Sequence, residues 1–163
     1  MSEITIAGYV PGAIGRVAEM HASYYGKSWD FGVYFEAKVA TELSQFLQRL
    51  DPARDCFWTA VRSGRVEGSI AIDGAKADTD GAHLRWFILS DALRGEGVGN
   101  RLLQEAVAFC RQRKHARVFL WTFHGLEPAR HLYEKFGFRL TEQIEGDQWG
   151  KRVLEQRYVL ELA

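Results

Sequence analysis

The stretch FILSDALRGEGVG, residues 87–99, joins an apolar run to a segment with helical periodicity and determines how the chain can fold. Its glycines Gly95, Gly97 and Gly99 permit backbone conformations closed to other residues, so successive N–H groups can converge on one anion. A helix that starts behind such a loop adds partial positive charge at its N-terminus. The stretch therefore predicts a strand, a phosphate-binding loop and a helix, in that order.

Two common phosphate-binding motifs do not fit this loop. The dinucleotide motif G-x-G-x-x-G fails because its last glycine would fall on Asn100 or Leu102. A P-loop needs a lysine followed by serine or threonine, which the loop does not have. The pattern that fits is R-x-x-G-x-G, formed by Arg94, Gly97 and Gly99. A glycine-rich turn without a ligand remains the alternative at this point, because short glycine motifs are weak evidence.

A second informative stretch, ARHLYEKFGF, covers residues 129–138. It follows an apolar run at residues 116–123 that is typical of a central strand buried on both faces. Pro128 suits the first turn of a short helix, and Gly137 suits its end.

The rest of the chain completes a regular alternation of elements. Upstream of the first stretch, helical spacing predicts helices over residues 14–25 and 35–50, with a loop at residues 26–32 between them. Alternating runs predict strands at 3–9, 55–62, 65–73 and 82–89, and two more strands follow Gly137. The resulting order is β α α β β β α β α β β. We predict one α/β domain over residues 1–163, with a mixed sheet covered by helices on both faces.

Composition excludes several classes of protein. The 163 residues are 47% hydrophobic, which argues against disorder, and 21 Lys and Arg balance 21 Asp and Glu. A net charge near zero gives no general attraction to nucleic acid or an anionic membrane. Cys56 and Cys110 lie in apolar runs without metal-ligand spacing, so we expect buried thiols and no metal. No signal peptide or membrane span is evident, and we expect a cytoplasmic protein.

The two stretches, taken in this order, resemble the GNAT superfamily of acyl-CoA-dependent N-acyltransferases. They span roughly residues 82–140, and the element order extends the likeness over nearly the whole chain. The segments 126–140, 149–150 and 154–157 look like the acyltransferase domains that some bacterial proteins fuse to a MarR-type DNA-binding domain. We expect no such partner domain here, and therefore no nucleic-acid binding. The resemblance implies a GNAT-like fold whose two central strands, ending at Leu89 and Phe123, splay apart to admit a cofactor.

The same resemblance assigns roles to individual residues. It implies acetyl-CoA as co-substrate and places the general acid that protonates the departing thiolate at Tyr133. A core aromatic on an apolar helix face is the alternative for this residue. The Leu89 amide becomes the candidate donor to the carbonyl oxygen, where charge develops as the amine attacks. Two departures from the family pattern are Leu126, where many relatives have a cofactor-contacting asparagine, and Asp91, where a proline is common. The expected cofactor-binding residues are Phe87, Ile88, Leu89, Arg94, Gly95, Glu96, Gly97, Val98, Gly99 and Asn100.

The expected acceptor site lies on the first two helices and their loop. Tyr25, Trp29 and Tyr34 are the candidate substrate-binding residues, and aromatic rings with nearby acids could surround a cationic amine. Packing of two amphipathic helices against the sheet is the alternative explanation of these aromatic residues. The candidates for the base that deprotonates the amine are His83, Arg85, Glu67 and His124, none of which the sequence favours.

The sequence thus predicts an N-acetyltransferase that transfers acetyl from acetyl-CoA to a primary amine on a small molecule or peptide, by direct attack. A non-catalytic acyl-CoA-binding sensor module is the alternative, and a purely structural protein is the third reading. The acceptor, the acyl chain length, the base and the oligomeric state stay open. A homodimer through the last strands is compatible with their pattern, which does not require it.

Overall fold

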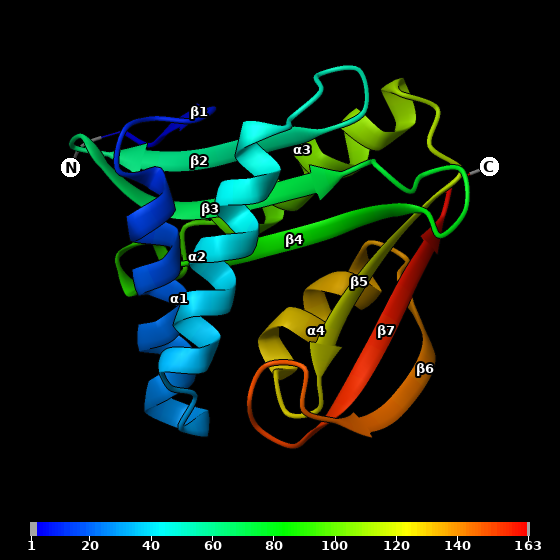
Figure 1. The fold of residues 1–163 in the computed structure, drawn as a ribbon. Coiled ribbons are helices and arrows are strands. Elements are labelled where there is room, and N and C mark those ends of the chain that lie inside the picture. Colours follow the sequence, from blue (N-terminus) through cyan, green and yellow to red (C-terminus); the bar gives the residue numbers. More distant parts are fainter. Residues whose placement is uncertain (1–2, 163) are drawn as a thin grey trace.

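The core of the molecule is a seven-stranded mixed sheet with the strand order β1-β2-β3-β4-β5-β7-β6 (Figure 1). The computed structural model describes residues 3–162. Neighbouring strands are antiparallel except β4 and β5, which are parallel. The elements are β1 (Thr5–Ala7), α1 (Ala13–Trp29), α2 (Val33–Gln48), β2 (Cys56–Arg62), β3 (Arg65–Asp73), β4 (Ala82–Leu89), the 3-10 turn η1 (Asp91–Leu93), α3 (Val98–Gln112), β5 (Arg117–Phe123), α4 (Glu127–Lys135), β6 (Arg139–Gly146) and β7 (Val153–Glu161).

This element order confirms the predicted fold class, and η1 is the one addition. The prediction of a loop at residues 26–32 is wrong for its first four residues, which continue α1. A Cβ at Gly26 would lie 3.1 Å from the Phe31 carbonyl oxygen, so glycine lets the chain fold back against the helix. Trp29 then packs against Phe123, with ring centroids 5.4 Å apart. This tertiary packing outweighs the weak helix propensity of glycine.

β2 and β3 form a hairpin whose connection has two residues. Ser63 and Gly64 have φ angles of 51° and 77°, as a turn with two left-handed residues requires. The hairpin supplies two antiparallel strands beside β4 and so places β4 near the middle of the sheet.

A β-bulge lies at Trp86, beyond the two residues of β4 that pair with β5. The β3–β4 register shifts between Ser69 and Ala71, and Trp86 has a φ of 48°. As a result Arg85 and Trp86 both face α2, whereas side chains of a regular strand alternate. Beyond the first two residues of β4 no pairing with β5 remains among the described residues, and the strands diverge in Figure 1. The splayed central strands are therefore confirmed.

Two apolar cores lie on opposite faces of the sheet. Behind it, α3 buries Leu102, Leu103 and Ala106 against β2–β5. In front of it, α1 and α2 bury Val17 and Leu43. In Figure 1, α1 and α2 lie in front of β2–β4, and α3 lies behind these strands.

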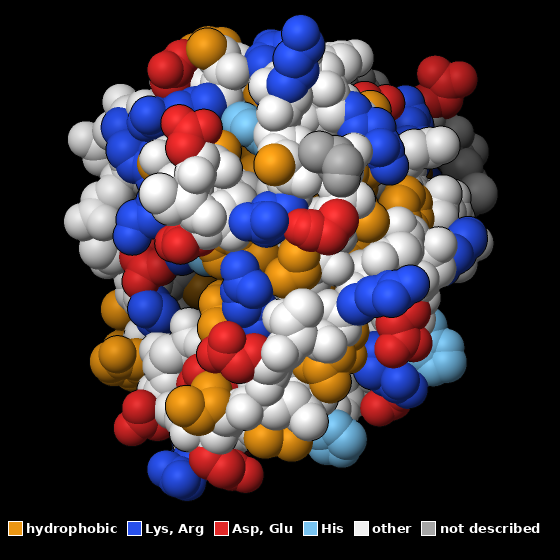
Figure 2. Space-filling model, turned by 90° about the vertical axis from the view of Figure 1, so that its right-hand side faces the viewer, with side chains coloured by type: hydrophobic (Ala, Val, Ile, Leu, Met, Phe, Trp, Pro, Cys, Tyr) orange, Lys and Arg blue, Asp and Glu red, His pale blue; other side chains and the backbone are white. Residues whose placement is uncertain are grey.

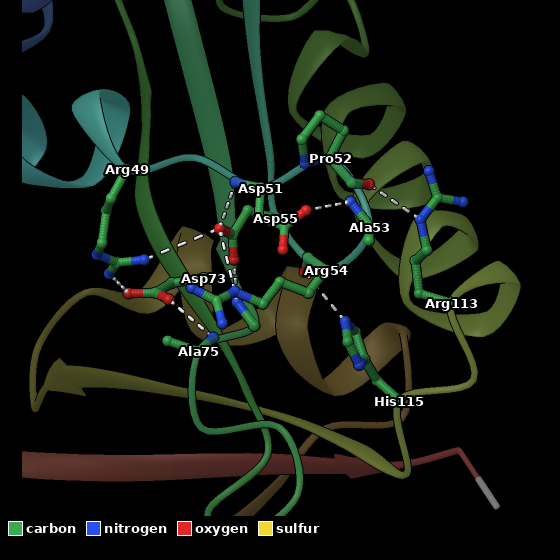
Figure 3. A network of polar contacts seen from close by, with 11 residues as sticks. Arg49, Asp51, Pro52, Ala53, Arg54, Asp55, Asp73, Ala75, Arg113 and His115 are labelled. Carbon is green, nitrogen blue, oxygen red and sulfur yellow. Dashed lines mark hydrogen bonds and ion pairs between the residues drawn. The ribbon is translucent and has the colours of Figure 1, made fainter.

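A polar network fixes the connection from α2 to β2 (Figure 3). The buried Asp55 accepts hydrogen bonds from the backbone N–H of Gly74 at 2.7 Å and of Asp51 at 2.9 Å. Arg49 donates to Asp73 at 2.6 Å. The network ties the loop after α2 to the end of β3.

No helix within residues 3–162 is long and apolar enough to cross a lipid bilayer.

Candidate active site

Two cavities meet in the gap between β4 and β5. The helix-side cavity has a volume of about 160 Å³ and is lined by α1, α2, β4 and β5. The loop-side cavity has a volume of about 190 Å³ and is lined by the end of β4, the start of α3 and α4. Five residues line both cavities: Tyr25, Phe87, Thr122, Leu126 and Tyr133. Two reactants that enter from opposite sides would therefore meet next to these residues.

The glycine loop forms an open backbone surface at the rim of the loop-side cavity. Gly95 and Gly97 have φ angles of 78° and 74°, which favour glycine, and a Cβ at either would find no atom within 4 Å. Gly97 is the N-cap of α3, and no side chain among the described residues caps this helix. Its first N–H groups are therefore available to a phosphate.

The other loop residues have structural roles that hold this surface in place. A Cβ at Gly99 would lie 3.1 Å from Leu89 Cδ1, so glycine allows α3 to approach β4 closely. Glu96 pairs with Arg62 of β2 at 2.6 Å. The Asn100 side chain accepts a hydrogen bond from Lys135 of α4 at 3.1 Å. Val98 is buried in the core, Arg94 lines the loop-side cavity, and Phe87, Ile88 and Leu89 form its β4 wall.

The Leu89 amide faces the gap. The backbone N–H of Ser90 donates to the carbonyl of Glu67 at 2.8 Å, which makes that pair a hydrogen-bonded one. Hydrogen-bonded and non-hydrogen-bonded pairs alternate along an antiparallel ladder. Leu89, paired with Gly68, is therefore in a non-hydrogen-bonded position, and its N–H points away from β3. A Cβ at Gly68 would lie 2.7 Å from Leu89 Cδ2, so glycine permits this close approach.

Tyr133 lies at the junction of the two cavities. Its ring packs among Phe87, Phe138 and Tyr158, with centroid separations of 5.8–6.2 Å. Its hydroxyl forms no hydrogen bond with the described residues. Burial raises the pKa of the Tyr133 phenol above its usual value, with a smaller contribution from Tyr25. The hydroxyl therefore keeps its proton at neutral pH and can donate it.

Of the three expected substrate-binding residues, only Tyr25 lines the two cavities. Trp29 packs against Tyr24, Tyr25 and Phe123 without lining either cavity. Tyr34 is 61% exposed and lies outside both. Much of the aromatic content of α1 and α2 therefore serves helix packing.

The candidate bases are also dispersed. His83 and Arg85 line the helix-side cavity. Glu67 pairs with Arg16 at 2.5 Å on the sheet surface, and His124 is exposed beyond β5. Burial, aided by the charge of Arg85, lowers the pKa of His83 to about 3, so its imidazole is neutral at neutral pH.

Sequence reasoning did not single out His21 or Lys38, which also line the helix-side cavity. His21 donates from Nδ1 to the Val17 carbonyl at 2.8 Å, because a carbonyl can only accept, and this leaves Nε2 as the acceptor of the neutral ring. The sequence signal for Lys38 is its spacing of four residues from Glu42, which predicts an ion pair on a helix but not a cavity.

Two broader features describe the surroundings of the site. Within residues 3–162, no three His, Cys, Asp or Glu side chains are grouped to hold a metal ion. On the face of the molecule in Figure 2, cationic and anionic side chains are interspersed, with no extended patch of one charge.

Comparison with known proteins identifies the family and the fold. Residues 15–138 match the family model described as the acetyltransferase (GNAT) family. An acetyltransferase from Streptococcus agalactiae superimposes with a TM-score of 0.76, at 21% identity and over 98% of both chains. A putative acetyltransferase from Salmonella typhimurium, solved with acetyl-CoA, gives a TM-score of 0.76 at 16% identity, over 99% of this chain and 95% of that one.

Curated relatives are enzymes of the same kind. An N-acetylaspartate synthetase from Danio rerio is 28% identical over 77% of this chain, and the human protein of that name is 30% identical over 71%. A probable N-acetyltransferase, camello, from Xenopus tropicalis is 28% identical over 80%. The matched region spans 45% and 38% of the two synthetases and 60% of camello.

Proposed function

The chain belongs to the GNAT acetyltransferase family of acyl-CoA-dependent N-acyltransferases, and we propose that it transfers an acetyl group from acetyl-CoA to a primary amine. One observation carries the proposal, namely the meeting of the two cavities at Tyr133. Acetyl-CoA would enter by the loop-side cavity, and the amine by the helix-side cavity.

The residues around the loop-side cavity fit acetyl-CoA, the co-substrate of the family. The open backbone at Gly95 and Gly97 and the uncapped start of α3 suit the pyrophosphate. The proposed phosphate-binding groups are the amides of residues 94–100. The edge of β4 at residues 87–89 that faces the gap is unpaired. It would bind the pantetheine arm in the way that it would pair with an additional strand. Leu126 offers an apolar contact there and no hydrogen bond.

The chemistry is a direct transfer. The neutral amine attacks the thioester carbonyl carbon, a C–N bond forms, and the oxygen takes up negative charge that the Leu89 N–H stabilises. The C–S bond then breaks, and the sulfur leaves as a thiolate that takes the phenolic proton of Tyr133. The proton lost by the attacking nitrogen restores the phenol. An acceptor that arrives as an ammonium ion first releases one proton to solvent.

The names of the relatives suggest the first acceptor to test. Proteins called N-acetylaspartate synthetase point to aspartate, whose α-amine is primary. Because this chain spans less than half of their length, aspartate is a proposal here. A peptide amine is the other acceptor class that the family likeness allows.

A matched pair of variants at Gly97 tests the donor site. Both Asn and Asp tolerate a positive φ and have nearly the same size, so Gly97→Asn and Gly97→Asp should fold alike. Asp adds a negative charge where the pyrophosphate would bind. Calorimetric titration with acetyl-CoA should show much weaker binding for Gly97→Asp than for Gly97→Asn.

Thiol release with a panel of amines then tests turnover. Transfer to at least one amine supports the enzyme. Equal acetyl-CoA affinity of the two Gly97 variants would contradict the donor site, and tight binding without turnover on any amine would instead identify an acyl-CoA sensor.

A further inference from the structure

The helix-side cavity has one charged cluster in its wall. Glu42 of α2 accepts a hydrogen bond from Lys38 at 2.6 Å and a second from Arg85 of β4. Although partial burial acts in the opposite direction, these two cations lower the pKa of the Glu42 carboxyl. The single carboxylate is therefore ionised and shared by two cations.

The other titratable groups that line this cavity carry no charge at neutral pH. Burial lowers the pKa of His21 to about 4 and that of His83 to about 3. Burial raises the pKa of the Tyr25 and Tyr133 phenols. Two cations and one anion then leave the cavity wall with an excess of one positive charge.

Charges just outside the lining do not cancel this excess. Asp73 is bound by Arg49 at 2.6 Å. Arg157, stacked over Phe119 at 4.8 Å, adds further positive charge on the side of His83. Asp30, between α1 and α2, is exposed on the surface and pairs with Lys151 at 3.4 Å.

Arg85 is held in position before any acceptor binds. Its guanidinium lies 4.2 Å from the centroid of the Trp86 ring, which the bulge turns to the same face. The bond to Glu42 uses Nη2 alone, and the side chain keeps 23% of its surface exposed. Arginine presents five N–H donors in a fixed fork, so donors remain for a second carboxylate. A cation fixed in advance loses little freedom on binding.

We propose that Arg85 and Lys38 bind a carboxylate of the acceptor, so that the acceptor is an amino acid or a similar amine that carries a carboxylate, rather than a polyamine. This inference rests on the proposed function. The amine would then point along the cavity to Tyr133, while the carboxylate remains at the α2 end.

The experiment compares Arg85→Gln and Lys38→Gln with wild type. Arg117→Gln is the control because it also removes one cation, in this case one paired with Glu161 on the surface outside the cavity. The acceptor probes are L-aspartate, L-alanine, L-alaninamide and putrescine. Alaninamide keeps the amine of alanine and lacks the carboxylate. Aspartate binding is measured by calorimetry in the presence of CoA, and turnover by thiol release.

We expect wild type to prefer alanine over alaninamide, and aspartate over putrescine. Arg85→Gln should raise the KM for aspartate at least tenfold, with a smaller rise for Lys38→Gln, and both should leave the KM for acetyl-CoA unchanged. Arg85→Lys should recover part of the loss, because it restores charge but not the fork. Arg117→Gln should behave as wild type.

Several results would overturn the carboxylate site: a preference for putrescine or alaninamide, or unchanged aspartate binding in Arg85→Gln and Lys38→Gln. Failure of the proposed function looks different. Wild type would then bind acetyl-CoA without acetylating any probe, and the calorimetric arm with aspartate would still decide whether the cations bind a carboxylate.

Discussion

The hydroxyl of Ser69 donates a 2.6 Å hydrogen bond to the carbonyl oxygen of Trp86 at the bulge where β4 leaves β5. Ser69 is fully buried, and Trp86 holds a φ of 48° that few non-glycine residues adopt. A strained backbone persists only when its surroundings hold it. This hydrogen bond therefore helps to keep the gap open and Arg85 directed into the helix-side cavity.

Replacing Ser69 tests the role of the bulge. Ser69→Ala leaves the Trp86 carbonyl without this donor, and we expect a loss of about 1–3 kcal/mol in the free energy of unfolding. Acetyl-CoA affinity should fall as well, since the Leu89 amide lies just beyond the bulge. Urea unfolding and calorimetry measure the two effects. The control is Ser44→Ala, whose hydroxyl bonds to the Ala40 carbonyl within α2 and should change stability by under about 0.5 kcal/mol. Equal effects of the two substitutions would contradict this role.

The sequence predicted the fold well because its signals are local, and the donor site that it indicates is likewise formed by contiguous residues. The glycine loop and the apolar run at 116–123 are each contiguous, and the hairpin at Ser63 and Gly64 follows from turn chemistry. The bulge was not predictable, since Trp86 fits a regular strand and only its pairing with β3 shows the extra residue.

The acceptor side was harder to predict for a related reason. Lys38 and Glu42 are four residues apart and indicate an ordinary helix pair. Arg85, which joins them, lies 43 residues from Glu42 along the chain. Tyr34 has the same aromatic character as Tyr25 in the sequence, and only packing separates the exposed ring from the one in the cavity.

Substitution of Asp55 should lower the stability of the protein without changing its KM for acetyl-CoA. Asp55→Ala removes the acceptor of two backbone N–H groups and leaves the charges of Arg49 and Arg54 less balanced (Figure 3). We expect a loss of about 2–4 kcal/mol in the free energy of unfolding, by denaturant titration. At a temperature where the variant is folded, the KM for acetyl-CoA should not change. The exposed pair of Arg117 and Glu161 provides the comparison, because Glu161→Ala should cost under about 1 kcal/mol. A smaller effect at Asp55 than at Glu161 would refute the structural role of the network.

The burial of His21 allows a prediction of how the free energy of unfolding depends on pH. Burial lowers the pKa of His21 in the folded protein to about 4, below the value of about 6.5 in an unfolded chain. The unfolded state therefore takes up the proton first as pH falls, and stability is lost between about pH 6.5 and 4. From pH 7 to pH 5 the loss due to His21 should be roughly 2 kcal/mol.

Urea unfolding at the two pH values measures this loss, and His21→Leu should remove that part of it. The partly buried His83 acts in the same direction and should account for a remainder. His131→Gln, at an exposed position, serves as the control and should leave the pH dependence as it is in wild type. If the free energy of unfolding of His21→Leu depends on pH as strongly as that of wild type, His21 is not buried as a neutral ring.

Tyr133→Phe separates a catalytic phenol from a core aromatic. The substitution keeps the ring that packs against Phe87 and Phe138 and removes only the hydroxyl. Because that hydroxyl bonds to no described residue, stability should change by under about 1 kcal/mol. If the phenol protonates the departing thiolate, kcat should fall about 10²-fold, with the KM for acetyl-CoA nearly constant, since the phosphates bind elsewhere.

Tyr158→Phe is the matched control for this prediction. Tyr158 is 1% exposed and packs 6.2 Å from Tyr133, yet it lines neither cavity, so its substitution should leave kcat within about twofold of wild type. Steady-state kinetics with thiol release compares the two variants directly. A kcat for Tyr133→Phe that matches wild type would assign Tyr133 to packing alone and leave protonation of the sulfur to water. A loss in Tyr133→Phe that Tyr158→Phe does not share would place the proton donor at the junction of the two cavities, between the glycine loop and the Lys38–Glu42–Arg85 cluster.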